Sequence, residues 1–187
     1  RSLLYLAVTA EESGLLGSAY FAEYPPVDLS QIVAGFNFDA LQPGGKSKDV
    51  IIVGYGASQL EDILVRKLKK FGKYIRPDPE PEKGFFYRSD HISLSKKGVP
   101  TLYADAGFDK VDGGVEAGQR LAERYTREDY HQSSDEYNPN WDLSGIVEQL
   151  SITAEIVLDL ANSLNWPEWY EGNEFRSIRE ESRSSSQ

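Results

Sequence analysis

The sequence predicts an α/β domain in which helices cover both faces of a mostly parallel, mixed sheet. Short apolar segments typical of buried strands alternate with stretches whose apolar residues recur at helical spacing. The chain has 187 residues, of which 40% are hydrophobic, as expected for one domain of ordinary size. We therefore predict one domain over residues 1–170 and a polar, flexible tail over residues 171–187.

The first half of the chain contains three predicted strands and two predicted helices. An apolar strand is expected over residues 2–10, and the helix after it ends before Pro25 and Pro26, because proline cannot continue a helix. The next elements are strands over 33–38 and 50–53 and a helix that starts at Ser58. The basic residues of this last helix are interpreted as its solvated side: Arg66, Lys67, Lys69 and Lys70.

The second half of the chain predicts fewer regular elements. These are a loop over 77–81, a short helix over 92–96, a strand over 101–104 and a helix that begins near Asp142. Between Asp105 and Tyr130 the chain is rich in glycine and charge. Because a loop of this length is usually functional or disordered, we place it at the rim of the site.

Composition excludes several classes of partner. The net charge of −10 argues against binding to nucleic acid and to anionic lipid surfaces, since both need basic residues. No apolar run approaches the roughly 20 residues of a membrane span. Cysteine is absent, so any metal ion must be held by nitrogen and oxygen atoms.

Two adjacent glutamates, Glu11 and Glu12, follow the first predicted strand. Ligands of open α/β sheets bind in the crevice beyond the carboxyl ends of the strands. Adjacent carboxylates in such a crevice repel each other, so without a cation at least one of them should be protonated. A metal ion would remove this conflict. Acidic residues are, however, also favoured in the first turn of any helix.

Four motifs occur in order along the chain. They are Val8 to Ser18, which contains the glutamate pair; Asn37-Phe38-Asp39; Tyr87-Arg88-Ser89-Asp90-His91, followed by Lys97-Gly98-Val99-Pro100; and Tyr130-His131-Gln132-Ser133-Ser134-Asp135. Together they resemble the M28 family of zinc aminopeptidases, over a region from about Arg1 to Arg179. The resemblance implies a three-layer α/β/α zinc-peptidase-like domain.

The resemblance also implies a ligand set for two zinc ions in the intact protein. Glu12 and His131 would bind one ion, Asp39 would bind the other, and Glu11 would act as the general base. Imidazole nitrogen and carboxylate oxygen are ordinary zinc ligands. The implied substrate is a peptide with a free N-terminus, and a water shared by the two ions would attack its first peptide carbonyl.

Other residues of the motifs are expected around these ligands. Tyr87 is a candidate to donate a hydrogen bond to the developing oxyanion, although packing explains it equally well. Asp90 and His91 would lie beside the metal ions without binding them. Asp135 could accept a hydrogen bond from the second ring nitrogen of His131.

The family's complete site also uses a histidine and a bridging aspartate that precede the glutamate pair, and the chain begins after that position. We therefore expect a partial catalytic domain that is impaired or inactive by itself and holds one zinc ion or none. Its sheet should miss N-terminal elements, and the exposed edge would favour self-association. A secreted or periplasmic bacterial location is expected from the resemblance alone.

Four alternatives stay open. A glutaminyl cyclase shares the fold and the glutamate pair. A serine hydrolase could use Ser89, Asp90 and His91, but residues adjacent in sequence seldom face one another as a relay. A nucleotide site at Gly54-Tyr55-Gly56 lacks the third glycine of the usual pattern. Finally, the acidic crevice could bind calcium or a partner without catalysis.

Overall fold

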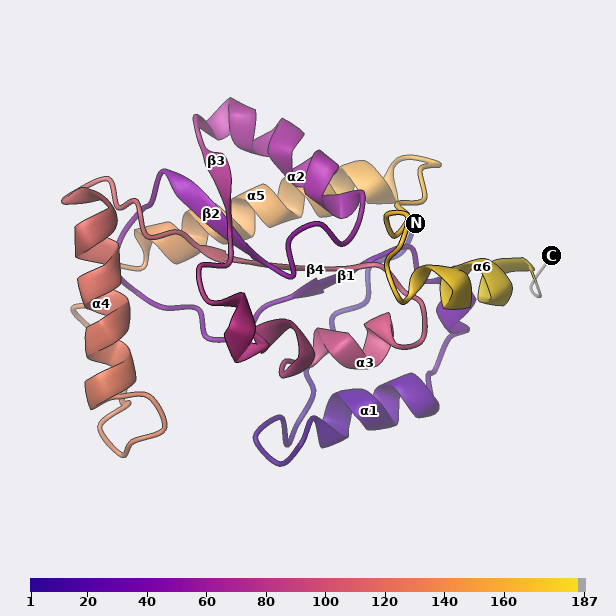
Figure 1. The fold of residues 1–187 in the computed structure, drawn as a ribbon, viewed down its shortest axis with the longest axis horizontal. Coiled ribbons are helices and arrows are strands. Elements are labelled where there is room, and N and C mark those ends of the chain that lie inside the picture. Colours follow the sequence, from indigo (N-terminus) through magenta and orange to yellow (C-terminus); the bar gives the residue numbers. More distant parts are fainter. Residues whose placement is uncertain (185–187) are drawn as a thin grey trace.

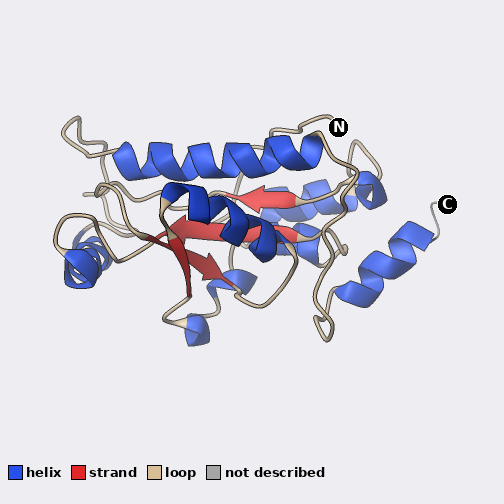
Figure 2. Ribbon diagram, turned by 90° about the horizontal axis from the view of Figure 1, so that it is seen from above, coloured by secondary structure: helices blue, strands red, loops and turns tan. Residues whose placement is uncertain are grey.

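The computed structural model describes residues 1–184 as a four-stranded sheet with helices on both faces (Figures 1 and 2). The strand order is β1-β4-β2-β3, and the bounds are β1 (Gly35–Asn37), β2 (Asp49–Val53), β3 (Tyr74–Pro77) and β4 (Thr101–Ala106). The pairs β1–β4 and β2–β3 are parallel, whereas β2 and β4 are antiparallel. The predicted mixed α/β sheet is therefore confirmed.

The helices form a layer on each face of the sheet (Figure 1). One layer contains α1 (Leu16–Glu23) and α3 (His91–Ser95), and the other contains α2 (Leu60–Leu68) and α5 (Ser144–Ala161). Two further helices, α4 (Gly114–Glu128) and α6 (Arg176–Ser184), lie toward the two ends of the molecule. Short 3₁₀ turns are η1 (Leu29–Gln31), η2 (Lys69–Phe71), η3 (Pro81–Lys83) and η4 (Phe85–Tyr87).

The main core lies between the sheet and the layer of α2 and α5. The apolar stripes predicted for these two helices pack against the central strands, which is why their positions could be predicted from helical periodicity. The buried members of this core are Val50, Ile52, Leu60, Leu64, Leu68, Leu102, Ile152, Ile156 and Leu160. A smaller cluster of Ala57, Ile92, Trp169 and Phe175 closes one end.

The strand predicted over residues 2–10 is wrong. These residues form no regular structure, and no strand of the sheet pairs with them. Leu4 is 57% exposed and Tyr5 is 90% exposed. An apolar sequence becomes a strand only where neighbouring strands satisfy its backbone hydrogen bonds, and here β1, at the edge, pairs only with β4.

Three other segments also differ from the sequence prediction. The predicted loop between Asp105 and Tyr130 contains the fifteen-residue helix α4. The strand β3 was not predicted, and it pairs in parallel with β2 along one edge. The region expected to be a flexible tail contains α6, in which Arg179 is buried, and Phe175 just before this helix is also buried. Residues 185–187 of that predicted tail lie outside the described part of the chain.

The sequence suggested that all the basic residues of α2 are solvated, but the structure shows that one of them is buried. Lys67 is only 7% exposed, and its ammonium group pairs with the carboxylates of Asp159 and Glu155 on α5. A buried charge is costly unless it is paired, and these two acidic residues supply the pairing.

Over residues 1–184, every helix is too short or too polar to cross a membrane.

Candidate active site

The glutamate pair lies in a tight turn just before α1. The carbonyl of Glu11 accepts hydrogen bonds from the backbone nitrogens of Gly14 and Leu15, at 3.0 and 2.9 Å. At Gly17 the backbone nitrogen donates to the carbonyl of Thr9 at 2.9 Å, and a Cβ atom at Gly17 would lie 2.4 Å from that same oxygen. Glycine at this position thus permits the close approach that fixes Glu11 and Glu12 next to the helix.

His131 reaches Glu12 from the opposite part of the chain. Its Nε2 lies 2.9 Å from Glu12 Oε1, across 119 residues of sequence. His131 has a positive φ of 58°, and its ring stacks on Tyr130 with centroids 3.9 Å apart. Both side chains are exposed, with 51% of His131 and 72% of Glu12 accessible. The structure therefore brings together the two residues that the resemblance assigned to one zinc ion.

Glu11 lies within a group of carboxylates. Burial is the largest cause that raises the pKa of Glu11 above its usual value. The charges of Asp39, Glu12 and Asp90 raise this pKa further, and only His131 acts in the opposite direction. The repulsion between carboxylates that the sequence suggested is thus present, and it adds to the effect of burial on the pKa of Glu11.

Asp39 lies at the end of β1 and is held by Ser89. The Ser89 hydroxyl donates to Asp39 Oδ2 at 2.5 Å, and Asn37 Nδ2 donates to Ser89 Oγ at 2.7 Å. Ser89 is 4% exposed. Its hydroxyl positions the aspartate and forms no hydrogen bond with either ring nitrogen of His91, so a relay of Ser89, Asp90 and His91 is not formed.

His91, the other histidine of the chain, is buried next to this group. It is 4% exposed, and neither ring nitrogen has a hydrogen-bond partner among residues 1–184. Phe86 and Tyr103 pack edge-on against its ring, with centroids 4.8 and 5.3 Å away. Burial lowers the pKa of His91 to about 4, and the negative charge of Asp39 opposes this shift only partly. The imidazole is neutral at physiological pH.

Tyr87 and Asp135 have partners outside the glutamate group. The Tyr87 hydroxyl donates to Glu174 Oε1 at 2.7 Å, beside a pocket of ≈ 260 Å³ that both residues line. Asp135 accepts a hydrogen bond from the Tyr125 hydroxyl at 2.9 Å, so the contact of His131 in this structure is to Glu12. The roles predicted for Tyr87 and Asp135 stay predictions.

Two residues of β4 also lie at this site: Tyr103, which was given no role in the sequence analysis, and Asp105, which was expected at the rim of the site. Tyr103 pairs with Asn37 in the register of β1 and β4 and contacts His91. Its pKa is raised by burial and by the charges of Asp105, Asp39 and Glu11. Burial also raises the pKa of Asp105 to about 6. Only the strand register reveals Tyr103, because its position depends on which strands are neighbours.

The described residues contain no complete metal site. Over residues 1–184, no three His, Asp or Glu side chains come together as a group that could hold an ion. Glu12 and His131 are in contact and have the donor atoms that zinc prefers. They fit two positions of a zinc site, which needs at least one further protein ligand.

Comparison with known proteins identifies the family. Residues 1–154 match peptidase family M28, which is most of the chain. The chain belongs to peptidase family M28. The zinc-peptidase-like fold expected from the four motifs agrees with this membership and with the mixed sheet flanked by helices.

Other comparisons with this M28 chain are more distant. One similar solved structure is an aminopeptidase from Aneurinibacillus sp. strain AM-1, with 17% sequence identity and a TM-score of 0.41. The similarity covers 62% of the M28 chain described here and 29% of the chain of that aminopeptidase. No curated protein matches the sequence.

Proposed function

We propose that this M28 chain contributes part of the active site of a zinc-dependent aminopeptidase that acts on peptides with a free N-terminus. The observation that carries the proposal is the contact of Glu12 with His131 at 2.9 Å, beside a glutamate whose pKa is raised. Distant parts of the sequence thus supply two zinc-type donors and a candidate proton acceptor at one place. The family membership supports peptide hydrolysis as the reaction.

In this proposal each residue has a separate task. Zinc, when bound, would polarise the scissile carbonyl and lower the pKa of a water molecule. Glu12 and His131 would hold one ion, and Asp39, oriented by Ser89, is the candidate ligand of a second. Glu11 would accept the proton of the nucleophile on its carboxylate and pass it to the leaving amine, a role suited to a carboxylate with a raised pKa.

Zinc content per chain tests the metal part of the proposal. After dialysis against trace zinc, we expect about one ion per chain, which His131→Ala removes because one of the two contacting donors is lost. Glu116→Gln is a matched control, since Glu116 is exposed on α4, where it forms an ion pair with Arg120. An ion that remains in His131→Ala would contradict the assignment, whereas a folded chain without zinc would show that ligands beyond Glu12 and His131 are indispensable.

Activity tests the role of Glu11. In an active, zinc-loaded sample, Glu11→Gln should reduce the rate by about 10²- to 10⁴-fold, the usual contribution of a general base, and should leave zinc content unchanged. Release of a free amino acid identifies an aminopeptidase, whereas loss of the N-terminal amine without release identifies a glutaminyl cyclase. An unchanged rate in Glu11→Gln would favour a non-catalytic binding module.

Two further parts of the proposal concern the context of the chain. The outer edge of β1 has no strand partner within residues 1–184, and we propose that it can support self-association. Size measurement over a range of concentrations tests this. We also propose an exported bacterial location, which cell fractionation of the parent protein tests.

A further inference from the structure

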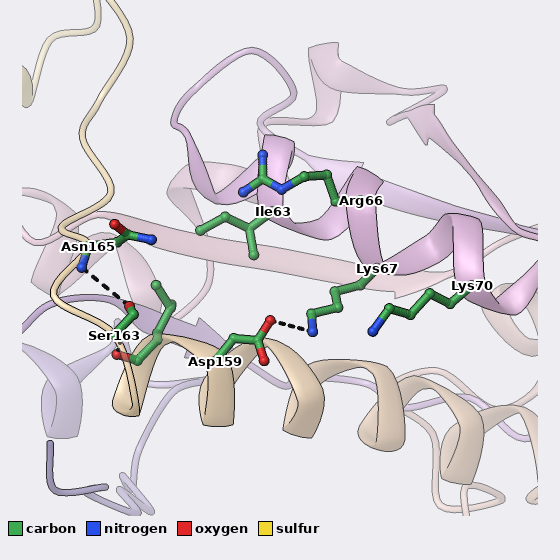
Figure 3. Close-up of a pocket in the computed structure, with 8 residues that line it drawn as sticks. Ile63, Arg66, Lys67, Lys70, Asp159, Ser163 and Asn165 are labelled. Atoms are coloured by element: carbon green, nitrogen blue, oxygen red, sulfur yellow. Dashed lines mark hydrogen bonds and ion pairs between the residues drawn. The ribbon is translucent and has the colours of Figure 1, made fainter.

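A pocket of ≈ 270 Å³ lies between α2 and α5, on the face of the sheet opposite to α1 and α3 (Figures 1 and 3). One wall is formed by α2 and the turn η2 that continues it. Its residues follow the spacing i, i+3, i+4 and i+7, so their side chains share one stripe: Ile63, Arg66, Lys67 and Lys70. The opposite wall is formed by Asp159, Leu160, Ser163 and Asn165. The pocket is separate from the glutamate group at the start of α1.

Positive charge is in excess in this pocket. Lys67 is paired with Asp159 and Glu155, and Lys70 lies 3.6 Å from the same Glu155 carboxylate. Arg66 has no hydrogen bond or ion pair within residues 1–184. Three basic side chains therefore face two carboxylates, in a chain whose net charge is −10.

The basic side chains of this pocket do not all point in the same direction. Figure 3 shows the Lys67 and Lys70 ammonium groups side by side and directed toward α5, with Arg66 extended along α2 beside Ile63. Like charges four residues apart on a helix, such as Arg66 and Lys70, destabilise it unless an anion offsets them. Asn165 turns its side-chain amide toward the same space and adds a neutral donor.

We propose that this pocket binds a phosphate-type oxyanion. A guanidinium group matches the geometry of phosphate oxygens with two parallel hydrogen bonds, and an ammonium group adds a mobile point charge. Lys70 would contact the ligand directly, Arg66 would do so once its guanidinium group turns from its place beside Ile63, and Lys67 would contribute its charge while remaining paired with Asp159. Ile63 and Leu160 provide an apolar surface for a small carbon group, so the oxyanion can be free phosphate or a phosphomonoester.

An alternative role for the basic residues at the end of α2 is to stabilise the helix through its dipole, without binding a ligand. Lys69 separates the two explanations, because it is exposed in the same turn and does not line the pocket. A general effect of positive charge would depend on Lys69 as much as on Lys70. A specific site would depend on Arg66 and Lys70 alone.

The test is a calorimetric titration of the metal-free full chain with inorganic phosphate at constant ionic strength. Metal-free protein is used because phosphate also binds zinc, and binding here would then be independent of the proposed peptidase site. We expect saturable binding that Arg66→Ala and Lys70→Ala each weaken by about tenfold, the effect of losing one charge-assisted hydrogen bond. Lys69→Ala should bind as the unchanged chain does.

A change of opposite sign sharpens the test. Asp159→Asn removes a negative charge from the pocket and should tighten phosphate binding. Acetate should bind more weakly than phosphate. A parallel titration with glycerol phosphate shows whether the site prefers a phosphomonoester or free phosphate, since the preferred ligand has the lower dissociation constant. Absence of saturable phosphate binding, or an equal loss in Lys69→Ala, would overturn the proposal.

Discussion

Residues 2–10 and strand β2 are both apolar segments, yet only β2 belongs to the core. All five residues of β2 are buried, and Ile52 is 1% exposed. β2 has β4 on one side and β3 on the other. Residues 2–10 have no strand neighbour, and Tyr5 is 90% exposed.

This difference shows that apolar composition alone does not make a strand. A strand is stabilised when its backbone groups are paired on the sheet and its side chains are covered on the faces. β2 satisfies both conditions, because α2 and α5 pack over it. The segment 2–10 instead places Glu11 and Glu12 next to α1. We therefore expect the first region to determine stability and the second to determine chemistry.

The largest difference in stability should appear between a substitution in the core strand β2 and one in residues 2–10. Ile52→Ala should lower the free energy of unfolding by about 2–5 kcal/mol, because it leaves a cavity in a packed core. Leu4→Ala, at a side chain that is 57% exposed, should change it by less than about 0.5 kcal/mol. Urea denaturation measures both. A comparable loss in Leu4→Ala would show that residues 2–10 are packed in solution.

A second contrast uses pH, through two groups at the buried side of the site. The folded-state pKa of His91 is lowered to about 4, so stability from this group is lost as pH falls from about 6.5 to 4. The pKa of Asp105 is raised to about 6, so its contribution is lost as pH rises from about 4 to 6. Each group changes the free energy of unfolding by about 3 kcal/mol over its pH range, and the two changes have opposite signs.

The unchanged chain should therefore show little net dependence of stability on pH from these two groups. His91→Gln should become more stable as pH falls from 6 to 4, and Asp105→Asn should become less stable over that range. Urea denaturation at several pH values measures this. Parallel curves for the two variants would contradict the opposite shifts.

A third test concerns the attachment of the segment to α1. Gly17→Ala would place a Cβ atom 2.4 Å from the Thr9 carbonyl oxygen, so the backbone must move apart. We expect a loss of about 1–3 kcal/mol in the free energy of unfolding, the usual cost of overpacking. Faster proteolysis near residue 10 should accompany it. Unchanged proteolysis would mean that this contact does not hold the glutamate turn.

The smallest effect on stability should come from Glu12. Its contact with His131 is between two exposed side chains, and exposed ion pairs contribute little. Glu12→Gln should change the free energy of unfolding by less than about 0.5 kcal/mol while reducing zinc binding. If Glu12→Gln instead destabilises the chain strongly and leaves zinc binding intact, the pair has a structural role.

The helices α2 and α5 were predictable because their apolar residues repeat at helical spacing and pack on a sheet. The strand β3 was not, since its sequence of Tyr74, Ile75, Arg76 and Pro77 has a proline and little apolar alternation. For α4, charge and glycine in the sequence concealed a helix that exposes most of its surface. Such elements depend on contacts that local patterns do not encode.

The sequence by itself determined the family and the fold class, because motifs keep their order and spacing along the chain. It also predicted Glu11, Glu12, Asp39 and His131 as site residues. The tertiary structure decided which of them meet. Only the folded chain brings His131 to Glu12 and encloses Lys67 between α2 and α5. It also leaves residues 2–10 outside the sheet. Contacts between distant residues follow from the packing of whole elements, and that packing depends on which neighbours are present to satisfy backbone hydrogen bonds and buried charge.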